Sequence, residues 1–272
     1  MIGKTAKSLE PSGIVTLTTD FGEVGSYVGQ MKGVILSLAR QAAIVDITHS
    51  VGPQNVQQAA MILDEATRRF PAGTVHVAVI DPGVGTARRI LAARIGSQYY
   101  VAPDNGLLSL LASRYEGNVF VELTERKYWL PEVSATFHGR DIMAPVAARL
   151  LGGLAIDWLG RPINQLHECV WAEPALQANR IVGQVIAVDT FGNAITNIER
   201  DHLPDVSSAP QWKITSNARA AVAFVATYGQ AAVGDLVALC GSSGRLEFAV
   251  VNGSAAKEFG FEVGDEAVVE WP

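Results

Sequence analysis

The chain has 272 residues, of which 49% are hydrophobic and 18% charged, and its formal net charge is −6 at pH 7. This length is enough for one large domain or two smaller ones with a substantial core. The acidic balance argues against nucleic acid as a partner. Cys169 and Cys240 are too few for a disulfide framework and lack metal-ligand spacing. Because the sequence shows neither a signal-peptide core nor a membrane-length apolar stretch, we expect a cytoplasmic protein with no membrane partner.

The first part of the chain alternates between strand and helix patterns. The predicted order is strand, helix, strand, helix, strand, with the elements at Ile14–Thr19, Ser26–Arg40, Ala43–Ile47, Val56–Phe70 and a strand that begins at Val75. This alternation predicts an α/β domain with a largely parallel sheet and flanking helices. Asn55 is in position to cap the second helix.

Two carboxylates follow predicted strands of this domain. Asp20 comes after the first strand, and Asp81 ends the strand that begins at Val75 and precedes a turn with Gly83 and Gly85. Parallel sheets bind ligands at the carboxyl ends of their strands, so both side chains are candidates for a site. The alternative for Asp81 is that it only bonds the backbone amides of its own turn.

The next segments predict a hairpin, a turn and a second polar corner. Ile90–Ala102 is read as a hairpin that turns at Gly96-Ser97, and a turn at Pro103–Gly106 precedes a short helix at Leu107–Ser113. His138 stands just before a helical run at Ile142–Leu151. It is either a reactive group or a structural histidine whose nitrogens are already bonded.

The composition changes after about residue 152. Gly152–Asn179 has little periodicity and indicates a connecting segment, within which we assign the linker to residues 166–180. The predicted domains are therefore residues 12–165 and 181–272. Short apolar runs separated by turns predict a small all-β, barrel-like second domain, with runs at Ile181–Val188, Ala194–Ile198, Ala220–Ala226, Leu236–Cys240 and Ala267–Trp271.

Two loops of the second domain have notable polar residues. Asp189–Asn193 joins two predicted strands, and Gly241–Glu247 is read as a glycine-serine turn able to offer backbone amides to a carboxylate. On these residues alone, ordinary turn chemistry is the favoured interpretation of both loops. Gly83-Val84-Gly85 is not a dinucleotide fingerprint, because Arg88 stands where the third glycine is required.

Six motifs occur together in this order: Thr19-Asp20-Phe21-Gly22, Asp81-Pro82-Gly83-Val84-Gly85-Thr86, Ala102-Pro103-Asp104-Asn105-Gly106, Phe137-His138-Gly139-Arg140-Asp141, Asp189-Thr190-Phe191-Gly192-Asn193 and Gly241-Ser242-Ser243-Gly244. The set resembles the S-adenosyl-L-methionine (SAM) hydroxide adenosyltransferases, which hydrolyse SAM to adenosine and methionine and are relatives of the SAM-dependent fluorinase and chlorinase. The resemblance implies an α/β domain, a β-barrel-like C-terminal domain and a homotrimer. It also implies that SAM lies between the N-terminal domain of one subunit and the C-terminal domain of its neighbour.

The resemblance assigns roles to individual residues. Asp81, Arg88 and His138 match the catalytic set of the family, with Arg89 as the adjacent alternative to Arg88. Asp81 or His138 would take the proton of the attacking water, and the choice between them stays open. The implied substrate contacts are Asp20 to the ribose hydroxyls, Asp189 to the methionine ammonium, Ser242 to its carboxylate, Glu247 near the amino-acid end, and Asn193, Val250 and Asn252 around adenine. No metal and no cofactor is expected, since SAM is the substrate.

Departures from the halogenases favour water as the nucleophile. Asp81 stands where the halogenases have Tyr, and Gly139 stands where the fluorinase has a halide-contacting Ser. A halide would meet the carboxylate of Asp81 as a like charge. Chlorinase-type halogenation remains an alternative, as do a non-catalytic SAM or adenosine sensor, a purely structural trimer and a different nucleoside-processing activity.

Overall fold

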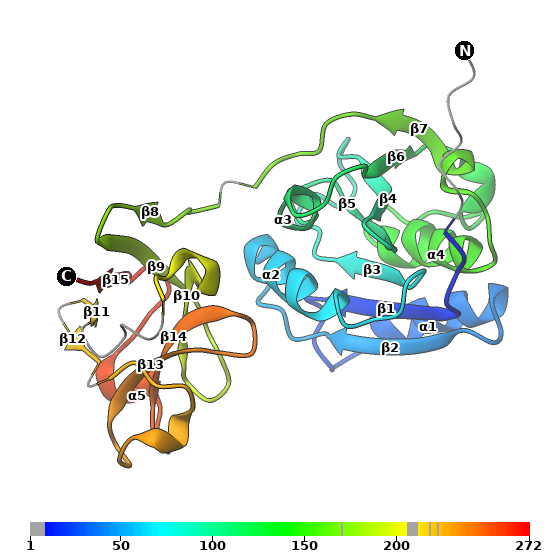
Figure 1. Cartoon of the computed structure of the whole chain (residues 1–272). Helices are drawn as coiled ribbons and strands as arrows, with labels where there is room; N and C mark the ends of the chain where they lie inside the picture. The colour runs from blue at the N-terminus through cyan, green and yellow to red at the C-terminus, as the bar shows by residue number, and fades with distance from the viewer. Residues whose placement is uncertain (1–8, 170, 206–211, 218, 222) are drawn as a thin grey trace. The chain divides into compact units, whose positions relative to one another are not determined.

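The computed structural model describes residues 9–169, 171–205, 212–217, 219–221 and 223–272. The chain divides into two compact units, Met1–Cys169 and Val170–Pro272 (Figure 1). Each unit has its own sheet and its own buried apolar core.

The N-terminal unit is built on a seven-stranded mixed sheet. Its strand order is β2 (Ala43–Thr48), β1 (Ile14–Thr19), β3 (Val75–Val79), β5 (Gln98–Pro103), β4 (Ile90–Ile95), β6 (Val119–Leu123) and β7 (Gly160–Ile163). The first four strands pair in parallel, as the alternation of strands and helices predicts. The remaining pairings, β5 with β4, β4 with β6 and β6 with β7, are antiparallel. β4 and β5 form a hairpin, because the two-residue turn at Gly96-Ser97 is too short for a crossover.

Helices cover both faces of this sheet. α1 (Tyr27–Leu38) and α4 (Ala144–Leu151) share one core with alternate side chains of β1 and β3, including Leu17 and Val77. α2 (Val56–Thr67) and α3 (Ser109–Ser113) pack with Ala78 and Ile80 on the opposite side. This alternation buries β3 on both faces, and all five of its residues are buried. The predicted cap is confirmed, since Asn55 accepts a hydrogen bond from the backbone N–H of Gln58 at 3.0 Å.

Short helices complete the N-terminal unit and correct one prediction. The unit contains the 3₁₀ helices η1 (Arg126–Tyr128) and η3 (Ile156–Leu159) and the π-helical turn η2 (Gly139–Met143). The interpretation of Gly152–Asn179 as a connecting segment is wrong over its first part, because η3 and β7 belong to this unit and β7 pairs with β6. β7 was not predicted because it contains Pro162, and proline is unfavourable inside a sheet. β7 is an edge strand, however, and an edge strand tolerates proline.

The C-terminal unit is a nearly closed, barrel-shaped antiparallel sheet, which confirms the predicted fold class. The strand order is β12 (Arg219–Ala220), β11 (Lys213–Ser216), β15 (Glu266–Glu270), β9 (Arg180–Val188), β10 (Ala194–Glu199), β14 (Arg245–Val250) and β13 (Leu236–Cys240), with β8 (Ala175–Leu176) paired to β9. The helices are η4 (Arg200–His202), η6 (Tyr228–Gln230) and α5 (Ala255–Phe259). The rings of Phe248 and Phe261 stack in the core of this unit, with their centroids 5.3 Å apart.

Two predicted segments of this unit differ from the structure. The turn predicted at Gly241–Glu247 is shorter, because β14 already begins at Arg245. Ala220–Ala226 does not form one strand: β12 ends at Ala220, and Phe224 makes an isolated bridge to Ala238, while residue 222 lies outside the described residues. Among the helices that the structure describes, none is long and apolar enough to span a bilayer.

Candidate active site

The two predicted carboxylates lie at the carboxyl ends of neighbouring strands. β1 and β3 pair in parallel with Thr19 opposite Val79, so Asp20 and Asp81 leave the sheet at the same edge. Asp20 accepts a hydrogen bond from the backbone N–H of Gln54 at 2.8 Å. Gln54 adopts a left-handed conformation with φ of 62°, and this turn directs its N–H to the carboxylate.

Asp81 is bound by Arg88 through a two-pronged ion pair. Arg88 Nε donates to Asp81 Oδ1 at 2.6 Å and to Oδ2 at 2.9 Å, and Arg88 Nη2 also bonds Oδ2. Only 5% of the Asp81 side chain and 11% of the Arg88 side chain are exposed. A planar guanidinium and a carboxylate fit each other in this fork, so the pair fixes the orientation of both groups.

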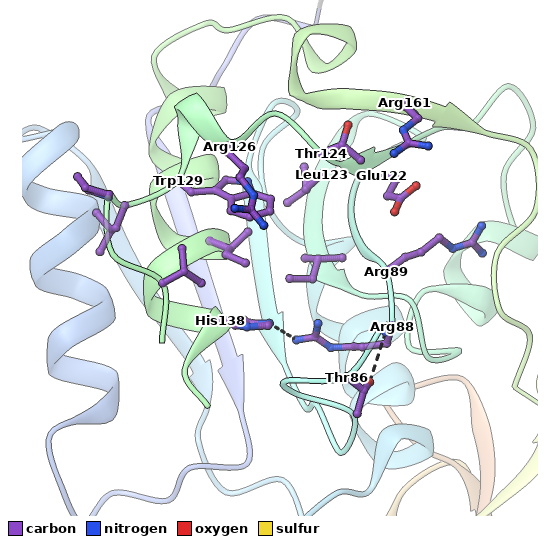
Figure 2. Close-up of a pocket in the computed structure, with 15 residues that line it drawn as sticks. Thr86, Arg88, Arg89, Glu122, Leu123, Thr124, Arg126, Trp129, His138 and Arg161 are labelled. Atoms are coloured by element: carbon purple, nitrogen blue, oxygen red, sulfur yellow. Dashed lines mark hydrogen bonds between the residues drawn. The ribbon is translucent and has the colours of Figure 1, made fainter. Parts of the chain in front are cut away.

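His138 continues this chain of polar contacts (Figure 2). Its Nδ1 lies 2.9 Å from Arg88 Nη2. Because a guanidinium only donates hydrogen bonds, Nδ1 is the acceptor, and the neutral ring carries its proton on Nε2. Burial, and then the neighbouring charge of Arg88, lower the pKa of His138. The imidazole is therefore held neutral near pH 7.

Arg89, the alternative to Arg88, has a different partner. Its Nε donates to Asp104 Oδ2 at 2.7 Å, and its Nη2 donates to the carbonyl of Gln165 at 3.0 Å. Asp104 also accepts the backbone N–H of His167 at 2.8 Å. The two consecutive arginines thus face two different carboxylates, and it is Arg88 that faces Asp81.

Glycines let two segments approach each other around this chain of contacts. Gly85 has φ of 80°, and a Cβ at this position would lie 2.6 Å from the carbonyl oxygen of Ala135. Gly139 opens the π-helical turn beside His138, and a Cβ there would lie 3.1 Å from Val79 of β3. Gly85 requires a residue without a side chain, because its φ is positive and a backbone oxygen occupies the place of a Cβ, whereas a Cβ at Gly139 would need Val79 to shift by a few tenths of an ångström.

The predicted residues Asp189 and Asn193 bond to each other in the C-terminal unit. Asp189 Oδ1 accepts the backbone N–H groups of Phe191 and Asn193, each at 2.9 Å. Its Oδ2 accepts the side-chain amide of Asn193, also at 2.9 Å. The carboxylate therefore shapes the loop between β9 and β10. Phe191 at the tip of this loop is 77% exposed.

Glu247 is a buried carboxylate with a partner that the sequence analysis missed. Its side chain is bonded by the hydroxyl of Tyr228, which lies in η6. A Cβ on Gly241 would lie 2.2 Å from Glu247 Oε2, so the glycine makes room for this carboxylate. Burial and the bond to Glu247 raise the pKa of Tyr228. No local pattern relates a 3₁₀ turn to a strand position 19 residues later.

Ser242, Val250 and Asn252 lie on the turns at the two ends of β14. Ser242 is exposed, Val250 is buried in the strand, and Asn252 is exposed with φ of 57°. Each turn is closed by a backbone hydrogen bond. The N–H of Gly244 donates to the carbonyl of Gly241, and the N–H of Gly253 donates to the carbonyl of Val250, both at 3.0 Å.

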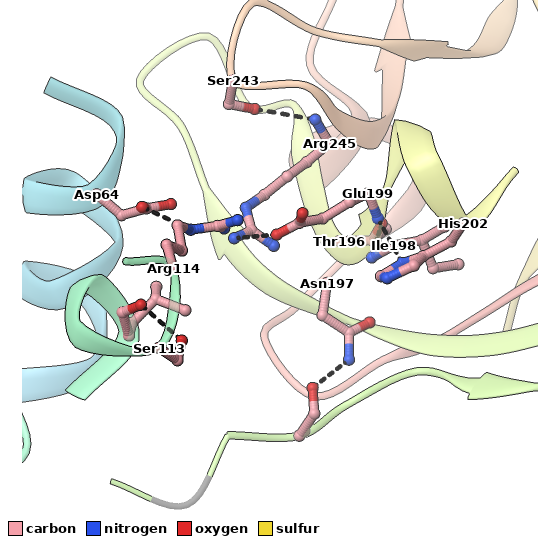
Figure 3. A network of polar contacts seen from close by, with 12 residues as sticks. Asp64, Ser113, Arg114, Thr196, Asn197, Ile198, Glu199, His202, Ser243 and Arg245 are labelled. Atoms are coloured by element: carbon pink, nitrogen blue, oxygen red, sulfur yellow. Dashed lines mark hydrogen bonds and ion pairs between the residues drawn. The ribbon is translucent and has the colours of Figure 1, made fainter. Parts of the chain in front are cut away.

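A polar network supports the Ser242 turn from β10 (Figure 3). Arg245 Nη2 lies 3.0 Å from Glu199 Oε1, and the backbone N–H of Arg245 donates to Ser243 Oγ at 3.3 Å. His202 Nδ1 accepts the backbone N–H of Glu199 at 3.0 Å. In the N-terminal unit, a comparable pair ties α2 to the end of α3, with Arg114 Nε 2.7 Å from Asp64 Oδ1.

The structure groups the predicted site residues within each unit. Asp20, Asp81, Arg88 and His138 belong to the N-terminal unit, and the remaining predicted contacts belong to the C-terminal unit. In the described part of the chain, no group of three or more His, Cys, Asp or Glu side chains could hold a metal ion. The N-terminal group provides a carboxylate, a permanent cation and a neutral imidazole in contact, which is machinery for handling a proton.

An α/β unit with this charged edge, followed by a barrel-shaped β unit, defines a two-domain protein. Residues 15–160 match the family model of the SAM hydroxide adenosyltransferase N-terminal domain, and residues 183–268 match that of its C-terminal domain. The chain therefore belongs to the SAM hydroxide adenosyltransferase family, as its motifs predict.

Individual relatives agree with this assignment. A protein of Salinispora tropica named (R)-S-adenosyl-L-methionine hydrolase is 36% identical over 94% of this chain and 97% of its own length. A crystal structure of an uncharacterized conserved protein from Thermotoga maritima superposes with a TM-score of 0.88 at 36% identity, covering 94% of this chain and 99% of that one. A fluorinase of an Actinoplanes species is more distant, at 28% identity over 87% of this chain and 90% of its own length.

Proposed function

We propose that this protein hydrolyses SAM to adenosine and L-methionine by in-line attack of water at the C5′ carbon of the ribose. The contact chain Asp81–Arg88–His138 carries the proposal, because it brings a carboxylate, a permanent cation and a neutral imidazole into contact. The family and the hydrolase relatives support the same reaction. The sulfonium departs as a neutral thioether, so the products are adenosine, methionine and one proton, and sulfur needs no general acid.

The hydrogen-bond directions favour Asp81 as the proton acceptor. His138 Nδ1 is occupied by Arg88, and its Nε2 carries a proton, so the neutral ring offers a donor and no free acceptor. Asp81 Oδ1 receives only one of the three bonds from Arg88 and keeps lone-pair capacity for a water. A carboxylate is a much weaker base than hydroxide, so it takes the proton only as the new C–O bond makes the water oxygen acidic. His138 orients the same water.

The substrate contacts belong to this proposal as well. A carboxylate suits the two ribose hydroxyls, and Asp20 Oδ1 has no hydrogen-bond partner among the described residues. The methionine and adenine ends would be met by polar loops of a C-terminal unit, namely Asp189, Asn193, Ser242, Glu247, Val250 and Asn252. The buried charge of Glu247 suits an ammonium group.

We also propose a homotrimer in the cytoplasm that uses no cofactor and binds neither nucleic acid nor membrane. The trimer rests on the resemblance, in which each site is completed by a neighbouring subunit. The net charge of −6 supports the lack of a nucleic-acid partner. Analytical ultracentrifugation of the purified protein tests the assembly: sedimentation as a monomer at micromolar concentration contradicts it.

The test of the reaction is product analysis in ¹⁸O-water with and without chloride. We expect adenosine labelled at the 5′ oxygen plus methionine, at a rate independent of chloride. A 5′-chloro nucleoside would move the protein to the halogenases. SAM or adenosine that stays bound without turnover would identify a sensor.

Neighbouring arginines provide a matched pair of variants for the site. Arg88→Lys removes the fork that holds Asp81 and contacts His138, whereas Arg89→Lys changes the contacts with Asp104 and with the carbonyl of Gln165 and leaves Asp81 and His138 untouched. We expect the first to lower kcat/KM by about 100-fold or more and the second by less than about 10-fold, because lysine cannot reproduce bidentate binding. Equal losses in both variants would contradict the assigned role of Arg88.

A further inference from the structure

A cavity in the N-terminal unit lies against the contact chain Asp81–Arg88–His138 and extends from it along β6 and β7. Its volume is about 710 Å³, and both Arg88 and His138 form part of its wall. Figure 2 shows the charged side chains around it: Arg88, Arg89, Arg126 and Arg161, with a single carboxylate, Glu122. The volume is in the range of small-molecule sites.

The four arginines differ in how well their charge is already balanced. Arg88 and Arg89 pair with Asp81 and Asp104, two carboxylates outside the cavity wall. Arg126 has its guanidinium 5.7 Å from the centre of the Trp129 ring. Within the described ranges, neither it nor Arg161 has a carboxylate partner within 4.0 Å.

Glu122 does not neutralise Arg161. The two residues are opposite each other in the register of β6 and β7, yet their charged groups form no ion pair within 4.0 Å in the part of the chain that is described. With the pairs of Arg88 and Arg89 counted as neutral, Arg126, Arg161 and Glu122 leave the cavity wall with an excess of one positive charge, and neither Arg126 nor Arg161 is held in an ion pair among the described residues. The remaining wall combines apolar side chains, including Ile90 and Val133, with the Trp129 indole, whose Nε1 is buried without an acceptor among the described residues.

We propose that this cavity, lined by Arg126 and Arg161, is a binding site for a small oxyanion, either a phosphate or a carboxylate. Guanidinium groups recognise the oxygens of both through forked, charge-assisted hydrogen bonds. The apolar wall gives room for a body attached to the anionic group. A simple halide offers no such geometry and binds only through its charge.

An anion in this site would act on the catalytic chain through the shared wall. A negative charge near His138 favours the protonated ring and offsets the effect of Arg88. If the proposed reaction needs neutral His138, the bound anion would inhibit turnover more strongly at acidic pH. This consequence rests on the proposed function, whereas the binding itself does not.

Calorimetric titration of the full-length protein with inorganic phosphate tests the site without SAM. The ionic strength is held constant with sodium chloride, and acetate in a second titration separates a carboxylate site from a phosphate site. We expect saturable binding of one anion per chain, weakened about 10-fold or more in Arg126→Gln and Arg161→Gln. Arg69→Gln is the control, since Arg69 is an exposed arginine outside the cavity wall.

Three results would overturn the proposal. They are the absence of saturable binding of either anion, binding that survives in the Arg126→Gln, Arg161→Gln double variant, and equal weakening by Arg69→Gln. Circular dichroism of each variant checks that it is folded. Because adenosine formation from SAM is assayed separately, failure of the anion site leaves the hydrolase proposal standing, and the reverse also holds.

Discussion

His76 makes the stability of the N-terminal unit depend on pH. It lies in the middle of β3, is fully buried, and has its ring stacked on Tyr100 at 5.0 Å. Its Nδ1 is 2.7 Å from Thr16 Oγ1. Burial lowers the pKa of His76 from 6.5 to about 3. The folded unit therefore keeps this ring neutral at any pH at which the protein is handled.

The sign and size of the effect follow from proton linkage. Below pH 6.5 the unfolded chain binds a proton on His76 that the folded chain does not bind until about pH 3. The free energy of unfolding is therefore undiminished by His76 above pH 6.5. Below pH 6.5 it falls by about 1.4 kcal/mol per pH unit. Between about pH 7.5 and pH 5 this single residue contributes a loss of roughly 2 kcal/mol in the free energy of unfolding.

The measurement compares the wild type with His76→Gln, which keeps a hydrogen-bonding group but cannot titrate. Urea unfolding is followed by pulsed hydrogen exchange on the peptides that contain β1 and β3, so that the N-terminal unit is read by itself. We expect the wild type to lose about 2 kcal/mol more than the variant between the two pH values. An equal loss in both proteins would refute the reasoning, since other titrating groups are common to both.

Three further predictions concern the site. When kcat/KM for SAM is measured against pH, we expect the midpoint of its fall on the acidic side to lie below pH 6.5. The reason is that the pKa of His138 is lowered and that the reaction needs its neutral form. A midpoint above pH 6.5 contradicts this role. Gly85→Ala should destabilise the unit by about 1–3 kcal/mol more than Gly153→Ala in thermal melts, because both glycines have positive φ but only Gly85 has an atom within 4 Å of the added Cβ. Asp20→Ala should raise KM more than it lowers kcat in steady-state assays, because ribose contacts are similar in the ground and transition states, and a pure kcat effect would contradict this.

The fold could be predicted where local patterns dominate. β1 and β13 have the predicted bounds because each is an apolar run closed by turn residues. β6 and β7 were not predicted, since their stability comes from pairing Phe120 with Ile163, residues that are distant in the sequence. Such a strand gains its hydrogen bonds from its partner and needs little pattern of its own.

The same distinction holds for the site. The pairing of Asp81 with Arg88 is local, since one turn joins the two residues, and the order of the motif was sufficient to single out Arg88. The hydrogen bond between Tyr228 and Glu247 joins a 3₁₀ turn to a strand. The sequence pattern of neither segment predicts this contact. The Asp189–Asn193 loop illustrates a third case, in which turn chemistry and a binding role use the same residues.

Two segments pack against each other around the contact chain Asp81–Arg88–His138. Asp141 is fully buried, accepts the backbone N–H of Ser134 at 2.8 Å and pairs with Arg140, which fixes the segment leading to His138. That segment presses the Ala135 carbonyl onto Gly85, in the turn that separates Asp81 from Arg88. The position of the imidazole and the position of the carboxylate therefore depend on one packed contact. In the proposed reaction these groups are therefore already in position, and preorganised polar groups need no reorganisation as the transition state forms.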